Sequence, residues 1–340
     1  MTRAGCKERD CRATFRSMSF RDALPRLGLR ESSDLPISIL AGRLAASGEL
    51  CAALEAYREI LDAAPDDQMS LLALAMLLGR LGRDDEEIAT RKRLAVLVVE
   101  QMGIHAEGKE AAVRFELATS GIGPTPSEMP SAYTVALFDS YAAHFNKNLR
   151  DDLGYHAPEY LHHALSLAMG PQKDGSIDIF DIGCGTGLLG PLLRTSARRL
   201  DGVDCSPRML DQAAAAGFYD DLAEADLTDA LTQRPGRYDV VTAADVFVYI
   251  GDLAPAFLAL SLALRRDGWV AFTVEEADAS MCEGDEGYAL GSSGRYVHTP
   301  AFVRAAAAAA GLLEVSVNAV TLRREQSRAV KGLVWVWRRR

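Results

Sequence analysis

A glycine-rich turn with the sequence DIGCGTG, residues 181–187, carries the strongest chemical signal in the chain. It follows an apolar stretch, 177–180, that is expected to form a strand, and it opens an expected helix. Glycines allow positive φ and carry no Cβ, so a ligand can lie against backbone amides where that helix begins. The spacing Gly185-x-Gly187-x-x-Gly190 also satisfies the dinucleotide fingerprint. The glycines therefore predict a nucleotide site and leave open whether it takes NAD or S-adenosylmethionine.

The acid before the first glycine distinguishes these two ligands. Asp181 is expected at the carboxyl end of the strand, where it faces the ligand. A carboxylate at that place repels a pyrophosphate and attracts the ammonium group of a methionine moiety. Asp204, 21 residues after Gly183, is expected to end the second strand and to accept hydrogen bonds from ribose hydroxyls, which both ligands require. The charges therefore favour S-adenosylmethionine.

Five motifs in order resemble those of the class I S-adenosylmethionine-dependent methyltransferases across residues 131–340. They are DIGCGTG (181–187), GVDCSPRML (202–210), EADL (224–227), YDVVTAADVFVYI (238–250) and LRRDGW (264–269). The segments FDSYAAHF (138–145) and LGYHAP (153–158) are similar to those of methyltransferases fused behind tetratricopeptide repeats. Asn146 departs from this subgroup, which usually has Asp there, so a contact from that position is in doubt.

The resemblance implies an α/β fold with a Rossmann-like, seven-stranded methyltransferase sheet and S-adenosylmethionine as the cofactor. The resemblance also implies which residues contact the cofactor. Asp181 and the backbone at Gly183, Gly185 and Gly187 hold the methionine portion; Asp204 holds the ribose, with Ser206 and Met209 beside it; Asp226 and Leu227 flank the adenine; Asp245 faces the methyl-donor end; and Tyr141 and Phe145 lie on a helix over the cofactor. For that last helix, a plain amphipathic core helix is the alternative.

Three residues are candidates for a general base. Methyl transfer is an in-line displacement from a sulfonium, so a base is needed only where the acceptor is a poor nucleophile. His144, His298 and Tyr249 are expected on the covering helix and on loops at the strand ends. A loop hydrogen bond is the alternative for His298, and a pocket wall is the alternative for Tyr249. No metal site is predicted, because the pair His162-His163 has no third ligand at metal spacing.

Strands and helices alternate along residues 131–340, which predicts a mostly parallel sheet covered on both faces. The expected strands are 176–182, 199–204, 221–224, 238–243, 269–274, 313–320 and 331–337. The expected helices are 133–146, 158–168, 187–198, 207–216, 254–264 and 300–310. Ser206-Pro207 and Thr299-Pro300 each place an N-cap hydroxyl before a first-turn proline, which supports this phasing.

The region before residue 120 is predicted to be helical. Ala53, Tyr57, Ile60 and Pro65 match the second half of a tetratricopeptide unit, and Gly82 lies 34 residues after Gly48. Glu87 and Arg91 stand where a second copy would have Ala and an aromatic residue, and an ordinary helical bundle is the alternative. The expected organisation is a disordered basic arm (1–30), a helical tetratricopeptide-like domain (31–120), a linker (121–130) and a methyltransferase domain (131–340). For the arm, a transit peptide or a translation start at Met18 are alternatives.

The charge and composition of the chain exclude several classes of function. The chain has 340 residues and a formal net charge of −10, which argues against a nucleic-acid substrate. No apolar stretch is long enough for a membrane span, and six scattered cysteines fit reduced thiols in the cytoplasm. The expected activity is methyl transfer to an unidentified small-molecule or protein acceptor, with a protein partner possible on the helical domain. An NAD(P)-dependent oxidoreductase and a non-catalytic scaffold with a vestigial nucleotide site are the alternatives.

Overall fold

The computed structural model describes residues 23, 35–145, 154–277, 282, 287–325 and 328–340. The chain separates into two compact units, Met1–Gly103 and Ile104–Arg340, each described below by itself. Apart from Ala23, the basic arm expected at residues 1–30 lies outside the described residues, as does Asn146. No helix in these described ranges is both long and apolar enough to cross a membrane.

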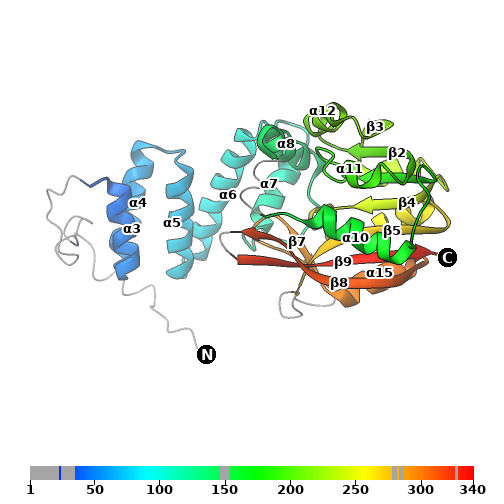
Figure 1. Cartoon of the computed structure of the whole chain (residues 1–340). Coiled ribbons are helices and arrows are strands. Elements are labelled where there is room, and N and C mark those ends of the chain that lie inside the picture. The colour runs from blue at the N-terminus through cyan, green and yellow to red at the C-terminus, as the bar shows by residue number, and fades with distance from the viewer. Residues whose placement is uncertain (1–22, 24–34, 146–153, 278–281, 283–286, 326–327) are drawn as a thin grey trace. The chain divides into compact units, whose positions relative to one another are not determined.

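The first unit contains two helical hairpins (Figure 1). They are formed by α3 (Ile37–Ser47) with α4 (Leu50–Ala63) and by α5 (Gln68–Arg80) with α6 (Asp84–Gln101). Gly48 ends α3 with φ +89°, and Gly82 follows α5 with φ +68°, so each turn uses a backbone conformation that favours glycine. Ala53 is fully buried between α3 and α4, which lets the two helices approach closely.

Cys51 of α4 is disulfide-bonded. The expectation that all six cysteines are reduced is therefore wrong for this residue. Cys184, Cys205 and Cys282 are free.

The division between the units falls before α7 (Lys109–Ala118) rather than at the linker expected at 121–130. The reason is aromatic packing. Phe115 of α7 is fully buried, and its ring lies 5.1 Å from that of Tyr133 and 6.5 Å from that of Tyr296. These residues form one apolar cluster with Met129, so α7 and the segment after it belong to the second unit.

The second unit is built on one mixed sheet. Strands β1 (Ile177–Ile182), β2 (Ala197–Asp204), β3 (Asp221–Glu224), β4 (Tyr238–Ala243) and β5 (Leu264–Glu276) are parallel, in the order β3-β2-β1-β4-β5. Strand β9 (Arg328–Arg339) pairs antiparallel with β5, and β8 (Leu312–Glu325) pairs antiparallel with β9. The mostly parallel arrangement was predicted.

The sheet has nine strands among the described residues, not the seven that the resemblance implied. The two additional strands, β6 (Tyr288–Leu290) and β7 (Tyr296–His298), form a hairpin whose second strand pairs with the end of β5. Strand β5 runs on to Glu276, beyond Phe272, where its pairing with β4 ends, and β7 pairs with Glu275 and Glu276 of this extension. This hairpin was not predicted.

Helices cover both faces of the sheet (Figure 1). Consecutive strand residues point to opposite faces. Ile179 packs with α10 (Ala157–Met169) and α11 (Gly190–Leu193), whereas Phe180 packs with α13 (Leu227–Thr232), α14 (Ala254–Ala263) and α15 (Pro300–Ala309). Two separate apolar layers therefore hold the sheet from either side.

The helix after the glycine turn is much shorter than expected. A helix was predicted over 187–198, but α11 covers only Gly190–Leu193. Gly187 has φ +84°, which an α-helix does not allow, and β2 already begins at Ala197. The turn therefore presents its amides without a long helix behind it.

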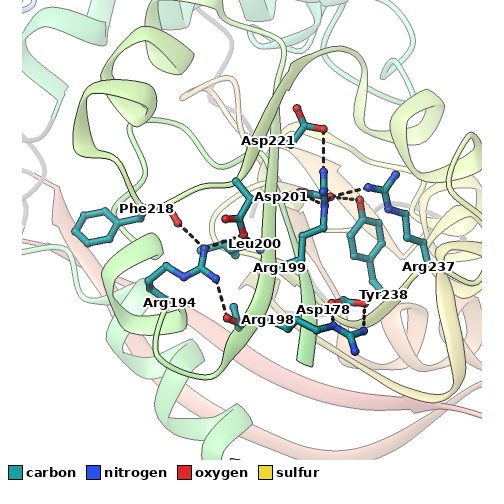
Figure 2. A network of polar contacts seen from close by, with 12 residues as sticks. Asp178, Arg194, Arg198, Arg199, Leu200, Asp201, Phe218, Asp221, Arg237 and Tyr238 are labelled. Carbon is teal, nitrogen blue, oxygen red and sulfur yellow. Dashed lines mark hydrogen bonds and ion pairs between the residues drawn. The ribbon is translucent and has the colours of Figure 1, made fainter. Parts of the chain in front are cut away.

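A polar network connects β1, β2 and β4 away from their carboxyl ends (Figure 2). Arg198 donates to Asp178 near the start of β1, and this hydrogen bond is the main cause that lowers the pKa of Asp178 to about 2. Asp201 accepts from Tyr238 at 2.8 Å and from Arg199 at 2.9 Å (Figure 2). These ion pairs and hydrogen bonds hold neighbouring strands together toward their amino-terminal ends. The cavity described next lies at the opposite, carboxyl ends of the strands.

Candidate functional site

A cavity of about 390 Å³ lies at the carboxyl ends of β1, β2 and β4. β2 follows β1 on one side, whereas β4 pairs with β1 on the other, so the cavity sits where the strand order reverses. In open α/β sheets this is the position where ligands bind. Of the sequence-predicted cofactor residues, those that line the cavity are Phe145, Asp181, Gly183, Gly185, Asp204, Met209, Asp226, Leu227 and Asp245.

The glycine turn forms the floor of the cavity. Gly183 has φ +61°, and a Cβ there would lie 2.5 Å from Val246 Cγ2, so this position excludes a side chain on two grounds. A Cβ at Gly185 would reach Phe145 only at 4.0 Å. Gly187 does not line the cavity; it turns the chain against the ring of Tyr219 instead. The turn therefore exposes two of the three predicted glycines to a ligand.

Asp181 is the last but one residue of β1 and is buried, with 2% of its surface exposed. Its Oδ2 accepts from the Tyr219 hydroxyl at 2.7 Å, and its Oδ1 accepts from the Thr242 hydroxyl at 2.8 Å. Burial raises the pKa of Asp181 to about 6, the two hydroxyls lower it, and the nearby charge of Asp204 raises it again. A cationic group in the cavity would compensate this buried carboxylate.

Asp204, the last residue of β2, is held by backbone amides. Its Oδ2 accepts from Gly185 N at 2.9 Å, and its Oδ1 accepts from Ser206 N at 2.9 Å. Burial raises its pKa, and these amide hydrogen bonds oppose the rise. Each carboxylate oxygen has a second lone pair, so Asp204 can still accept from the hydroxyls of a ligand.

Asp226 and Leu227 lie at the start of α13. Asp226 is the N-cap residue, and its Oδ1 accepts from Thr228 N at 2.8 Å and from Asp229 N at 3.2 Å. Its other oxygen is left for a ligand. Leu227 is the first helical residue, so its amide has no carbonyl four residues earlier within the helix. The pair therefore offers one acceptor and one donor side by side.

Helix α8 (Ser131–Tyr141) lies along one wall of the cavity. Ser131, Thr134, Val135 and Phe138 line the cavity, a spacing that puts them on one helix face. The helix is followed by η2 (Ala142–His144), and Phe145 also lines the cavity, as predicted.

Besides Gly187, two predicted cofactor residues lie outside the cavity lining. Tyr141 is half exposed and does not line the cavity, and its contact with the cofactor stays a prediction. Ser206 is fully buried and caps α12 (Pro207–Ala216), and its hydroxyl donates to Asp139 of α8 at 2.6 Å. Ser206 therefore holds the helix that lines the cavity, and its place beside a bound ribose stays a prediction.

The segment expected to be a linker forms part of the cavity wall. Glu128 and Met129 line the cavity, and Met129 N donates to Tyr249 O at 2.9 Å. Gly251 N donates to Ser127 O at 2.7 Å, which fixes the segment to the loop after β4. Nothing in the local sequence, which is rich in Gly and Pro, signalled this docking.

Asp245 follows β4 with φ +55°, a conformation rare for a residue other than glycine. Its amide donates to Thr273 Oγ1 at 2.8 Å, and its Oδ2 pairs with Arg323 at 3.2 Å. Arg323 is almost fully buried and also donates to Glu275 and, at 2.8 Å, to Glu325. Sequence reasoning found Asp245 and missed its partners on β5 and β8.

Tyr249, the last residue of η4 (Phe247–Tyr249), lines the cavity as predicted. Its ring lies edge-on to Phe138 at 5.2 Å, and its hydroxyl is hydrogen-bonded to Arg295. Burial raises the pKa of Tyr249, and Arg295 opposes the rise. A tyrosine whose pKa is raised is a poor base at neutral pH and a good hydrogen-bond donor.

His298 lies away from the cavity lining. It is fully buried on β7, and its Nε2 lies 2.8 Å from Ile250 O and 3.2 Å from Gly251 O, so this nitrogen carries the proton. Burial lowers its pKa to about 4. His298 therefore holds the loop after β4, which was the alternative for it. The side chain of His144 lies outside the described part of the structure.

The comparisons with known proteins identify the central part of this unit. Residues 180–270 match the family model of a methyltransferase domain. The ubiquinone biosynthesis O-methyltransferase of Bordetella bronchiseptica is 27% identical over 99 residues, which are 28% of this chain and 41% of that protein. Human methyltransferase-like protein 27 is 35% identical over 112 residues, 32% of this chain and 45% of that protein. The chain thus spans less than half the length of either relative.

Among solved structures, the [4+2]-cyclase SpnF is similar to this chain with a TM-score of 0.50 and 16% identity. The match covers 64% of this chain and 98% of that one. At this identity the likeness concerns the fold alone. The fold is therefore a Rossmann-like α/β fold, and its central part, residues 180–270, matches a methyltransferase domain.

Proposed function

We propose that this chain transfers a methyl group from S-adenosylmethionine to an acceptor bound in the same cavity. The observation that carries the proposal is the set of acids around the glycine turn. Asp181, Asp204 and Asp226 line the cavity from the ends of three neighbouring strands or the segments after them. A buried acidic lining suits a cationic nucleoside and repels a pyrophosphate.

The residues at the cavity fit each part of this cofactor. Asp204 would accept from the ribose hydroxyls, since its oxygens keep free lone pairs beside the amides of Gly185 and Ser206. Asp226 and the amide of Leu227 would bind the adenine edge. Asp181 would face the ammonium group, which relieves the cost of its own burial. The roles of these residues follow the order in which their strands lie in the sheet.

S-adenosylmethionine, when bound, supplies an electrophilic methyl group on a sulfonium. The chain's own contribution is alignment and exclusion of water. Phe138 and Phe145 cover the glycine turn from the α8 side. Asp245 and Tyr249 flank the methyl-donor end from the loop after β4.

A general base is not assigned to either described candidate. The Nε2 of His298 donates to two carbonyls, and His298 is outside the cavity lining. The pKa of Tyr249 is raised, so its hydroxyl stays protonated at neutral pH. The proposal therefore assigns Tyr249 a hydrogen-bonding role toward the acceptor and requires an acceptor that is nucleophilic as it binds.

The NAD(P)-dependent alternative is not favoured, because the methyltransferase match covers the glycine turn and the acids after β2 and β3. The scaffold alternative predicts that S-adenosylmethionine binds and is never turned over. Binding experiments alone do not separate this alternative from catalysis.

Thermal unfolding with S-adenosylmethionine, S-adenosylhomocysteine, NADH and NADPH in parallel tests the cofactor. A ligand at about 100 times its dissociation constant adds about 2.7 kcal/mol to the free energy of unfolding. We expect only the two sulfur nucleotides to raise the melting temperature and Asp204→Ala to abolish the rise. Asp211→Ala, which removes an exposed acid of α12, is the matched control. Stabilisation by NADH in its place would contradict the proposal.

We further propose that the two hairpins α3–α4 and α5–α6 are tetratricopeptide-like. Their turns use glycines 34 residues apart, and Ala53 is buried where a small residue is required. Replacing Glu87 by Ala and Arg91 by Tyr restores the pattern in the second copy and should raise the melting temperature. A fall would favour an ordinary bundle. A protein partner on this unit stays a prediction.

A further inference from the structure

Two arginines line the cavity on the side of the sheet that the proposed cofactor does not use. Arg295 precedes β7 and Arg323 lies near the end of β8. In the sheet order, Asp181, Asp204 and Asp226 lie at or just after the carboxyl ends of β1, β2 and β3. Arg295 is instead hydrogen-bonded to Tyr249 after β4, and Arg323 contacts Asp245 after β4 and Glu275 on β5. This part of the cavity is therefore available to the acceptor.

The side chain of Arg323 is held in place beneath this part of the cavity. Its side chain is 2% exposed, and its three nitrogens donate to Asp245, Glu275 and Glu325. A guanidinium with every nitrogen engaged holds its position and is unsuited to reaching a ligand. Its charge is offset by these three carboxylates, so Arg323 shapes this region and leaves the binding of a ligand to Arg295.

Arg295 is less constrained. Its side chain is 25% exposed; Nη1 donates to Glu325, and the guanidinium is hydrogen-bonded to the Tyr249 hydroxyl. A guanidinium has five N–H donors in a planar fork, so further donors are left for a ligand. Tyr249 faces the same cavity, and the two side chains form one donor surface.

The charges that face the cavity here differ from those behind it. Arg295, Arg323, Asp245 and Glu128 line the cavity, whereas Glu275 and Glu325 do not. Asp245 is already paired with Arg323 and with Thr273, and all three nitrogens of Arg323 are engaged, so Arg295 is the cation with donors left toward the cavity. These donors favour an anionic ligand at Arg295.

We propose that the acceptor carries a carboxylate, which Arg295 and the Tyr249 hydroxyl bind, and that the methyl group goes to a carboxylate oxygen. The inference rests on the proposed methyltransferase function. One carboxylate oxygen accepts from Arg295 and the other attacks the methyl carbon. The new O–CH₃ bond forms as the C–S bond breaks, the sulfonium becomes a neutral thioether, and the carboxylate loses its negative charge.

This step releases no proton, so it needs no general base. It therefore accounts for a cavity in which His298 is locked on two carbonyls and Tyr249 stays protonated. Phe138, Phe145 and Tyr155 also line the cavity, so a carboxylate on an aromatic or other apolar body fits the remaining walls.

The test uses the full chain saturated with S-adenosylhomocysteine and titrates three probes of one shape: benzoate, benzamide and benzylamine. We expect benzoate to bind about 10- to 100-fold more tightly than the neutral and cationic probes, the range for a hydrogen bond to a charged group. Arg295→Gln should remove this preference, and Arg295→Lys should retain part of it. Arg324→Gln, which removes an exposed charge from the neighbouring position of β8, should leave it unchanged.

The affinity for S-adenosylhomocysteine, measured in every variant, separates two kinds of failure. If S-adenosylhomocysteine does not bind the unaltered chain, the proposed function fails. If it binds equally to the unaltered chain and to Arg295→Gln, while benzoate shows no preference or keeps the same preference in Arg295→Gln, the carboxylate site is wrong. A preference for benzylamine would assign an amine acceptor instead.

Discussion

Ser206 donates its hydroxyl proton to Asp139 at 2.6 Å while its oxygen accepts from Met209 N at 3.2 Å. One hydroxyl therefore caps α12 and also holds α8, the helix whose face lines the cavity. The backbone amide of Ser206 also donates to the carboxylate of Asp204, the last residue of β2. The cavity wall and Asp204, the acid proposed to bind the ribose, thus depend on one short segment.

The first prediction separates the cap from the link to α8. Ser206→Ala removes both and should lower the free energy of unfolding by about 1 kcal/mol, the usual cost of losing an N-cap. Asp139→Ala removes the link, together with the bond that Asp139 accepts from Arg208 N at 3.4 Å, and leaves the Ser206 cap in place. It should therefore weaken binding of S-adenosylhomocysteine several-fold with a smaller loss of stability. Isothermal titration and thermal unfolding give the two quantities.

The double variant provides the control for this prediction. If the hydrogen bond between the two side chains is what positions α8, Ser206→Ala with Asp139→Ala should bind no more weakly than the weaker single variant. Fully additive losses of binding would mean that the two residues act independently.

The second prediction concerns the pH dependence of cofactor binding. The pKa of Asp181 is about 6 in the folded protein, and its ionised form attracts a cation. The affinity for S-adenosylmethionine should therefore rise as the pH rises through 6, by at most about tenfold per pH unit below it. Dissociation constants from about pH 5 to about pH 8 measure this dependence.

Variants assign this dependence to Asp181. Asp181→Asn should flatten it. Tyr219→Phe should move its midpoint upward, because the Tyr219 hydroxyl donates to Asp181 and lowers its pKa. A midpoint that is unchanged in both variants would assign the titration to another group.

The third prediction concerns the division of the chain. A fragment of residues 104–340 should unfold cooperatively and bind S-adenosylhomocysteine. A fragment of residues 131–340 should be destabilised by about 3 kcal/mol or more, because it lacks the fully buried Phe115 and the wall residue Met129. Thermal unfolding of both fragments beside the full chain checks this, and equal stability of the two fragments would contradict it.

The sequence predicted those site residues whose position follows from the strand pattern next to them. Asp181, Asp204 and Asp226 each end or follow a strand with its own apolar pattern, so their meeting at one sheet edge follows from a parallel sheet. Glu128 and Arg295 reach the same cavity from segments without a strand or helix pattern strong enough to position them. Their placement depends on packing around Phe115 and on an added hairpin, and neither is visible in local periodicity.

The fourth prediction is that Asp181 and His298 give the stability of the protein opposite pH dependences. Asp181 has a pKa raised from 3.8 to about 6, so between these values the folded protein binds a proton that the unfolded chain releases. Its contribution therefore lowers the free energy of unfolding as the pH rises through that window. His298 has a pKa lowered from 6.5 to about 4, so the unfolded chain binds the extra proton. Its contribution raises the free energy of unfolding as the pH rises.

Each contribution is on the order of 3 kcal/mol, so the two largely cancel between about pH 4 and pH 6 in the unaltered chain. Replacing one of the two residues should reveal the pH dependence that the other gives to the free energy of unfolding. Without its nucleotide, Asp181→Asn should lose stability steeply as the pH falls from 6.5, because only the histidine contribution remains. His298→Gln, which can keep a donor toward Ile250 O, should instead gain stability as the pH falls toward 4. Urea unfolding across this range measures both slopes, and slopes of the same sign in the two variants would mean that at least one burial-driven pKa shift has been assigned to the wrong group.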